Sequence, residues 1–142
     1  MEVSEVRRRL RGAIEEAKRR AADRRALADE AARVWEERLT DAVEPAFQAV
    51  LSALSGEGFR FSVSTPAGTA RLSLERSPAE FIEMGLDTER DLPAVLVRST
   101  RGRGRRIISA ERIVAEGPDI PDISQNAVVE ILIGELIPFV ER

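Results

Sequence analysis

The chain contains no cysteine, no histidine and no tyrosine, and Lys18 is its only lysine. Without cysteine there is no disulfide, no thiolate nucleophile and no cysteine-ligated zinc. Without histidine the chain lacks the commonest general base near neutral pH and the commonest transition-metal ligand. Lys18 falls within a charged helical run, Glu15 to Arg20, which suits neither a Schiff base nor a P-loop. We therefore expect no catalytic residue, no metal site and no cofactor.

Carboxylates remain as candidates for acid–base chemistry. Several lie in or beside an expected turn or on the wet side of an expected strand: Glu80, Glu83, Asp87, Glu89 and Asp91. A glycosidase-type pair requires two carboxylates across a deep cleft, which this placement does not favour. Residues 119–122, Asp-Ile-Pro-Asp, lack the dense acidic spacing of a calcium loop. These patterns predict a protein that is not an enzyme.

Long apolar runs are also missing. No stretch approaches the roughly 18 to 20 apolar residues of a membrane span, and the N-terminus carries Arg7, Arg8 and Arg9 among glutamates where a signal peptide would be apolar. We expect a cytoplasmic protein that makes no membrane contact. Basic residues are almost all arginine and alanine is abundant, which is typical of GC-rich bacterial coding. The 142 residues suffice for one domain.

Residues 3 to about 54 are predicted to be helical, because their apolar positions recur with a period close to 3.6. Pro45 cannot donate to the carbonyl of Asp41, so we expect the helix either to kink there or to restart. Before Pro45 the apolar stripe is mostly alanine, whereas after it come larger residues such as Phe47 and Leu54. This contrast predicts a charged helical arm for assembly, residues 1–39, joined to a small α+β domain, residues 40–142.

The arm is predicted to bind a partner. At 1.5 Å per residue, residues 3–39 would span about 55 Å, whereas a domain of about 100 residues has a radius of gyration of only ~13 Å. The apolar stripe is therefore expected to be buried against a second copy of the chain or against a helix of another subunit. The expected partner-binding residues are Val3, Leu10, Ile14, Ala17, Ala21, Ala28 and Trp35. Trp35 has two interpretations, an anchor for packing within the chain or a hot spot for a partner.

Period-2 alternation then predicts an antiparallel meander of four or five strands. Residues 59–64 and 70–75 form an expected hairpin, and further strands are expected at 81–86 and 94–99, with turns at 87–91 and 101–105. The second turn leads into the apolar runs 106–108 and 113–115. A closing helix, 124–141, is expected to be capped by Ser124 or Asp122 and to have a wide apolar face. The predicted fold is α+β, with the closing helix and helix 43–54 packed on one face of the sheet.

The segment 98–106 concentrates five arginines around two glycines: Arg98, Arg101, Arg103, Arg105 and Arg106. Guanidinium groups bind phosphate oxygens bidentately, which suits nucleic acid. No aromatic residue interleaves the run, so base stacking is not expected. The other interpretation is a solvated turn whose arginines pair with Glu111 or Glu116. We therefore predict a non-catalytic interaction subunit, with a nucleic-acid-binding accessory protein as the alternative.

Overall fold

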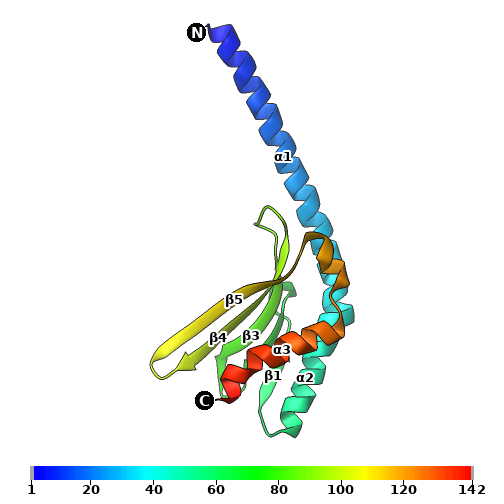
Figure 1. The fold of residues 1–142 in the computed structure, drawn as a ribbon, viewed down its shortest axis with the longest axis vertical. Coiled ribbons are helices and arrows are strands. Elements are labelled where there is room, and N and C mark those ends of the chain that lie inside the picture. The colour runs from blue at the N-terminus through cyan, green and yellow to red at the C-terminus, as the bar shows by residue number, and fades with distance from the viewer. Residues whose placement is uncertain (1, 142) are drawn as a thin grey trace.

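The computed structural model describes residues 2–141 and consists of one long helix, a five-stranded sheet and a second helix (Figure 1). The long helix has three parts: α1 (Val3–Arg38), a π-helical segment η1 (Leu39–Val43) and α2 (Glu44–Gly56). The other elements are β1 (Phe61–Ser64), the 3-10 turn η2 (Pro66–Gly68), β2 (Ala70–Leu74), β3 (Ser77–Asp87), β4 (Ala94–Arg103), β5 (Arg106–Glu116), the 3-10 segment η3 (Gly117–Asp122) and α3 (Gln125–Val140). The predicted α+β fold and its order of elements are confirmed.

The helix passes Pro45 through a π turn and does not restart. Because Pro45 has no amide hydrogen, the carbonyl of Asp41 has no partner four residues later. The N–H of Glu44 instead donates to the carbonyl of Leu39, an i to i+5 bond. Figure 1 shows the axis bending at this segment, so that α2 turns towards the sheet. The bend lets one continuous helix both project from the domain and pack inside it.

The five strands are antiparallel and ordered β1-β2-β3-β4-β5. α2 and α3 lie on the same side of the sheet (Figure 1), and α2 contacts β1 and β2 whereas α3 contacts β3. The strand residues that face these helices alternate and are fully buried, as Leu72, Ile82 and Val97 illustrate. The opposite face of the sheet carries no helix. Burial of one face on α2 and α3 is the arrangement that the sequence predicts.

The strands differ from the prediction at the arginine-rich segment. The expected turn 101–105 is mostly strand, because β4 runs to Arg103 and only Gly104 and Arg105 form the turn. Gly104 has a φ of 62°, which a tight two-residue hairpin requires and which glycine adopts without strain. β5 is one continuous strand that contains both of the apolar runs, 106–108 and 113–115. The β4–β5 hairpin consequently extends well beyond the neighbouring strands (Figure 1).

The end of α1 and the start of η1 belong to the core of the domain. Ala31, Trp35 and Leu39 are all buried, at 9%, 5% and 8% exposure, and join a cluster that includes the helices and the sheet. Ala31 is the first buried residue of the helix. The preceding residues 3–30, which we call the projecting segment, extend away from the sheet and from α3 (Figure 1), and at their end Leu27 and Glu30 line a hollow with Pro93 and η3. At 1.5 Å per residue the projecting segment is about 42 Å long.

Candidate partner-binding surfaces

An apolar stripe along the projecting segment is exposed to solvent. The exposed fractions are 75% for Val3, 44% for Val6, 57% for Leu10 and 44% for Ile14. Large apolar side chains exposed in a row, rather than singly, mark an interaction surface. The smaller residues Ala17, Ala21 and Ala28 continue the stripe and are exposed or half-buried. Val6 was absent from the expected partner-binding residues, although its position three residues after Val3 on the same face could have identified it.

Basic residues border this stripe on both sides. At 100° per residue, the bordering basic residues are Arg7, Arg11, Lys18 and Arg25 on one side and Arg20 and Arg24 on the other, and the acid Asp29 lies at the same angle as Arg11. The acids Glu5 and Glu16 lie on the back of the helix, where they pair with Arg9 and Arg19 at 3.0 and 2.6 Å. Among residues 2–141, no ion pair involves a bordering residue. The stripe therefore presents an apolar centre with a mainly positive rim.

Trp35 lies inside the chain rather than on the exposed stripe. Its side chain is 5% exposed, and its indole Nε1–H donates a hydrogen bond of 2.9 Å to the carbonyl oxygen of Gly68. This placement agrees with the first interpretation of Trp35, an anchor for packing within the chain. The exposed part of the stripe thus ends before Ala31.

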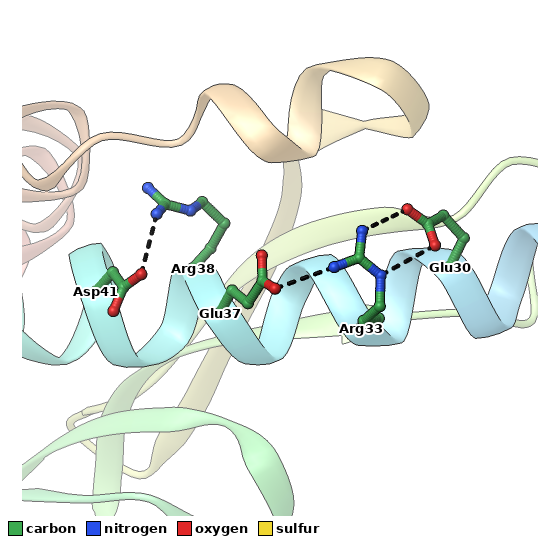
Figure 2. A network of polar contacts seen from close by, with 5 residues as sticks. All are labelled: Glu30, Arg33, Glu37, Arg38 and Asp41. Carbon is green, nitrogen blue, oxygen red and sulfur yellow. Dashed lines mark hydrogen bonds and ion pairs between the residues drawn. The ribbon is translucent and has the colours of Figure 1, made fainter.

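A polar network stiffens the helix where it leaves the domain. Figure 2 shows the polar residues at this point, Glu30, Arg33, Glu37, Arg38 and Asp41. The Arg33 guanidinium donates to both carboxylate oxygens of Glu30, at 2.7 and 3.1 Å, and to Glu37 at 3.0 Å. The hydrogen bond from Arg33, and its positive charge, lower the pKa of Glu30, and the same contact raises the pKa of Arg33. These contacts lie three and four residues apart, the spacing that stabilises an exposed helix.

Arg38 makes a second, separate set of contacts, closer to the domain. Its guanidinium pairs with Asp41 at 3.4 Å and donates to the carbonyl oxygen of Ile123 at 3.1 Å. Ile123 immediately follows η3, which packs against α1. The helix is therefore attached to the loop before α3 as well as to the turn that Trp35 contacts.

Arg98 is separated from the other arginines of segment 98–106. The register places Arg71, Glu83, Arg98 and Glu111 side by side on β2, β3, β4 and β5, on the face that no helix covers. Glu83 is 7% exposed and accepts hydrogen bonds from Arg71 at 2.7 Å and from Arg98 at 2.8 Å. Arg71 also lies 4.2 Å above the ring of Phe81. Arg98 therefore forms an ion pair with Glu83 within the sheet.

The other four arginines gather at the end of the β4–β5 hairpin: Arg101, Arg103, Arg105 and Arg106. Among residues 2–141, none of these four forms an ion pair with a carboxylate. Glu111 and Glu116 lie opposite Arg98 and Ala94, nearer the base of the hairpin. Ile107, 78% exposed, adjoins the cluster. The hairpin end is thus a basic surface.

No family model, curated protein or solved structure matches this chain. Within residues 2–141, no helix combines the length and the apolar character needed to cross a membrane. The same part of the chain contains no group of three or more acidic side chains arranged to hold a metal ion.

Proposed function

We propose that this protein is a non-catalytic interaction subunit that pairs through its projecting segment with a second copy of the chain or with a helix of another subunit. The observation that carries the proposal is the exposure of Val3, Leu10 and Ile14 along a helix that its own domain does not cover. Helices that lack tertiary packing are marginal in water, because most of their stability comes from burying an apolar face. A partner would supply that burial.

The apolar surface is large enough to contribute to association. Complete burial of a valine, leucine or isoleucine is worth about 1.5–3 kcal/mol, and the stripe carries four such exposed residues: Val3, Val6, Leu10 and Ile14. Association costs roughly 4–15 kcal/mol in lost freedom. These side chains are already partly buried, so two copies that each bury the exposed remainder would gain about 7–13 kcal/mol, which is of the same order as the cost.

The non-catalytic part of the proposal rests on the residue types and their places. Catalysis would have to use a carboxylate, since histidine, cysteine and tyrosine are absent. Glu83, the most buried carboxylate of the expected candidates, already accepts from Arg71 and Arg98. Glu89 and Asp91 are exposed in the turn between β3 and β4. A general base must be free to reach a substrate proton, whereas the Glu83 carboxylate is already held by two guanidinium groups and the other two carboxylates lie in solvent.

Light scattering on the full chain tests the proposal. We expect a dimer or larger assembly for the unmodified protein and a monomer for Leu10→Asp/Ile14→Asp. A matched control, Ala22→Asp/Ala26→Asp, adds the same charge at exposed positions on the other side of the helix and should leave the assembly unchanged. Substitution is preferable to removal of residues 1–38, because that deletion would also remove the buried Trp35. A monodisperse unmodified monomer with a folded projecting segment would contradict the proposal.

The hairpin end supports nucleic-acid binding as a second candidate function. The specific observation is the set of four guanidinium groups, Arg101 to Arg106, that make no ion pair within residues 2–141. Guanidinium groups without a carboxylate partner are available for phosphate oxygens. The basic border of the projecting segment could add further phosphate contacts.

A further inference from the structure

We propose that the apolar stripe of one copy docks in the groove between α2 and α3 of a second copy, so that two chains exchange their projecting segments. This inference rests on the proposed function, since it names the partner of the same stripe. It commits to a second copy because the chain carries both halves of a complementary pair of surfaces. One half is the stripe with its basic border, and the other is the groove.

The groove between α2 and α3 is apolar and open. Its volume is about 240 Å³. Buried side chains of Val50, Leu54 and Leu136 form its floor, and Ile133 stands beside it at 50% exposure. The remaining lining residues are Ala49, Ala53, Glu57 and Val129. Small alanines on α2 leave space for the side chains of another helix.

The exposed side of α3 extends this groove. Ile137 and Val140 lie one and two turns beyond Ile133 and are 48% and 42% exposed. A helix with apolar residues on its exposed side as well as its buried side is normally covered on both. α3 thus has an uncovered apolar face that adjoins the groove.

The helices that form the two surfaces carry opposite charges, although Arg60 and Arg76 share a hollow with Val140 at the end of α3. α2 and α3 contain three glutamates and no basic residue: Glu44, Glu130 and Glu135. Glu57 lines the groove, and Glu141 follows α3. Arg112 pairs with Glu135 at 3.0 Å, whereas Glu57, Glu130 and Glu141 take part in none of the ion pairs found within residues 2–141. An acidic rim around an apolar groove complements an apolar stripe with a basic rim.

The length of the stripe also fits the length of α3. Val3 and Ile14 are separated by about 16 Å along the helix, and α3, with 16 residues, is about 24 Å long. Anchors spaced by three, four and seven residues are typical of a helix that binds in a groove. Val3, Val6, Leu10 and Ile14 have this spacing.

A chain cannot place its stripe in its own groove. The helix is continuous from Val3 to Gly56, so Ile14 and Ala49 are held about 50 Å apart along it. Between two copies, mutual exchange would satisfy both surfaces on each chain and close the assembly as a twofold dimer.

Charge reversal tests this docking. Arg7→Glu/Arg11→Glu/Lys18→Glu in the projecting segment should weaken self-association about tenfold or more. Glu57→Lys/Glu130→Lys/Glu141→Lys beside the groove should do the same. A chain with all six substitutions should recover the association measured by sedimentation equilibrium, because opposite charges then face each other again. Failure of the six-substitution chain to recover, with both triple variants correctly folded by circular dichroism, would overturn the docking.

A crosslink locates the contact directly, since the chain has no native cysteine. Equal amounts of Leu10→Cys and Ile133→Cys chains, mixed and treated with a short bis-maleimide, should yield a covalent heterodimer. Ile107→Cys, at another exposed isoleucine, is the matched control and should not crosslink to Leu10→Cys.

The outcomes separate this inference from the proposed function. Loss of assembly in Leu10→Asp/Ile14→Asp, together with no effect of the groove substitutions and no crosslink to Ile133→Cys, would overturn the docking while the assembly role stood. An unchanged assembly in Leu10→Asp/Ile14→Asp would overturn both. A helix with a basic border can also lie on an anionic membrane. Binding to phosphatidylserine vesicles by a chain that does not self-associate would therefore overturn the docking as well.

Discussion

Trp35 and Gly68 join the long helix to the turn between β1 and β2. The indole N–H lies 2.9 Å from the glycine carbonyl oxygen, 33 residues later in the chain. The side chain is 5% exposed and belongs to the main core. This contact sets the position from which the projecting segment leaves the domain.

We expect Trp35→Ala to destabilise the protein by about 3–5 kcal/mol, since it leaves a large cavity. Trp35→Phe retains most of the apolar contact but leaves the Gly68 carbonyl without this donor, at a cost of about 1 kcal/mol. Urea denaturation followed by circular dichroism measures both. Equal stability of the two variants and the unmodified protein would show that Trp35 does not anchor the helix.

Glu83 is expected to stabilise the uncovered face of the sheet. Glu83→Gln removes the negative charge between Arg71 and Arg98 and leaves two positive charges near each other. Because the arginine side chains are 31% and 48% exposed, water moderates the effect, and we expect a loss of about 1–3 kcal/mol. Glu111→Gln, in the same row but exposed, should change stability by less than about 0.5 kcal/mol. Chemical denaturation in which the two variants behave alike would contradict this role.

Glu30 provides a test by pH. Its pKa in the folded protein lies below the usual 4.5, because Arg33 hydrogen bonds to the ionised carboxylate. The contact therefore contributes fully above about pH 4.5 and is lost as the pH falls through the lower folded value. Carbon-13 NMR titration should show the lowered pKa in the unmodified protein and a return to the usual value in Arg33→Ala. An unchanged Glu30 pKa in that variant would exclude Arg33 as the cause.

The hairpin end is the nucleic-acid surface if the second candidate function holds. Replacement of Arg101, Arg103, Arg105 and Arg106 by serine should abolish binding to duplex DNA, whereas Arg98 is retained because it pairs with Glu83. Four phosphate contacts predict a salt dependence with a logarithmic slope of about −3.6. Fluorescence anisotropy at several salt concentrations measures the slope. Absence of binding by the unmodified chain at low salt would remove this function.

The periodicity of apolar residues was sufficient to predict the helices and most of the strands. The 3.6-residue repeat predicted a helix over 3–54, and the structure extends it to Gly56. The start of the third strand was predicted less well. Pro78 suggested that the strand begins after it, at residue 81. In the structure β3 begins at Ser77, and residues 78–80 lie where the ladder with β2 shifts register, so the missing N–H of Pro78 costs no ladder bond.

The candidate surfaces could not be predicted from the sequence, because they depend on tertiary structure. Arg98 is separated from the hairpin end because the strand register places it beside Glu83. The local sequence around Arg98 does not specify that register. The groove depends on how α2 packs against α3, which hydrophobic spacing alone does not specify. The burial of Trp35 also follows from tertiary contacts, because the same helical face is exposed at Leu10 and buried at Trp35.

Hydrogen exchange of the backbone amides in residues 3–30 tests the central claim, that a second copy covers the apolar stripe. At a concentration where the unmodified chain is assembled, these amides should exchange slowly, because the helix is packed. In Leu10→Asp/Ile14→Asp they should exchange much faster, while those of α2 remain protected. Equal exchange of the projecting segment in the two proteins, whether slow or fast, would contradict the account.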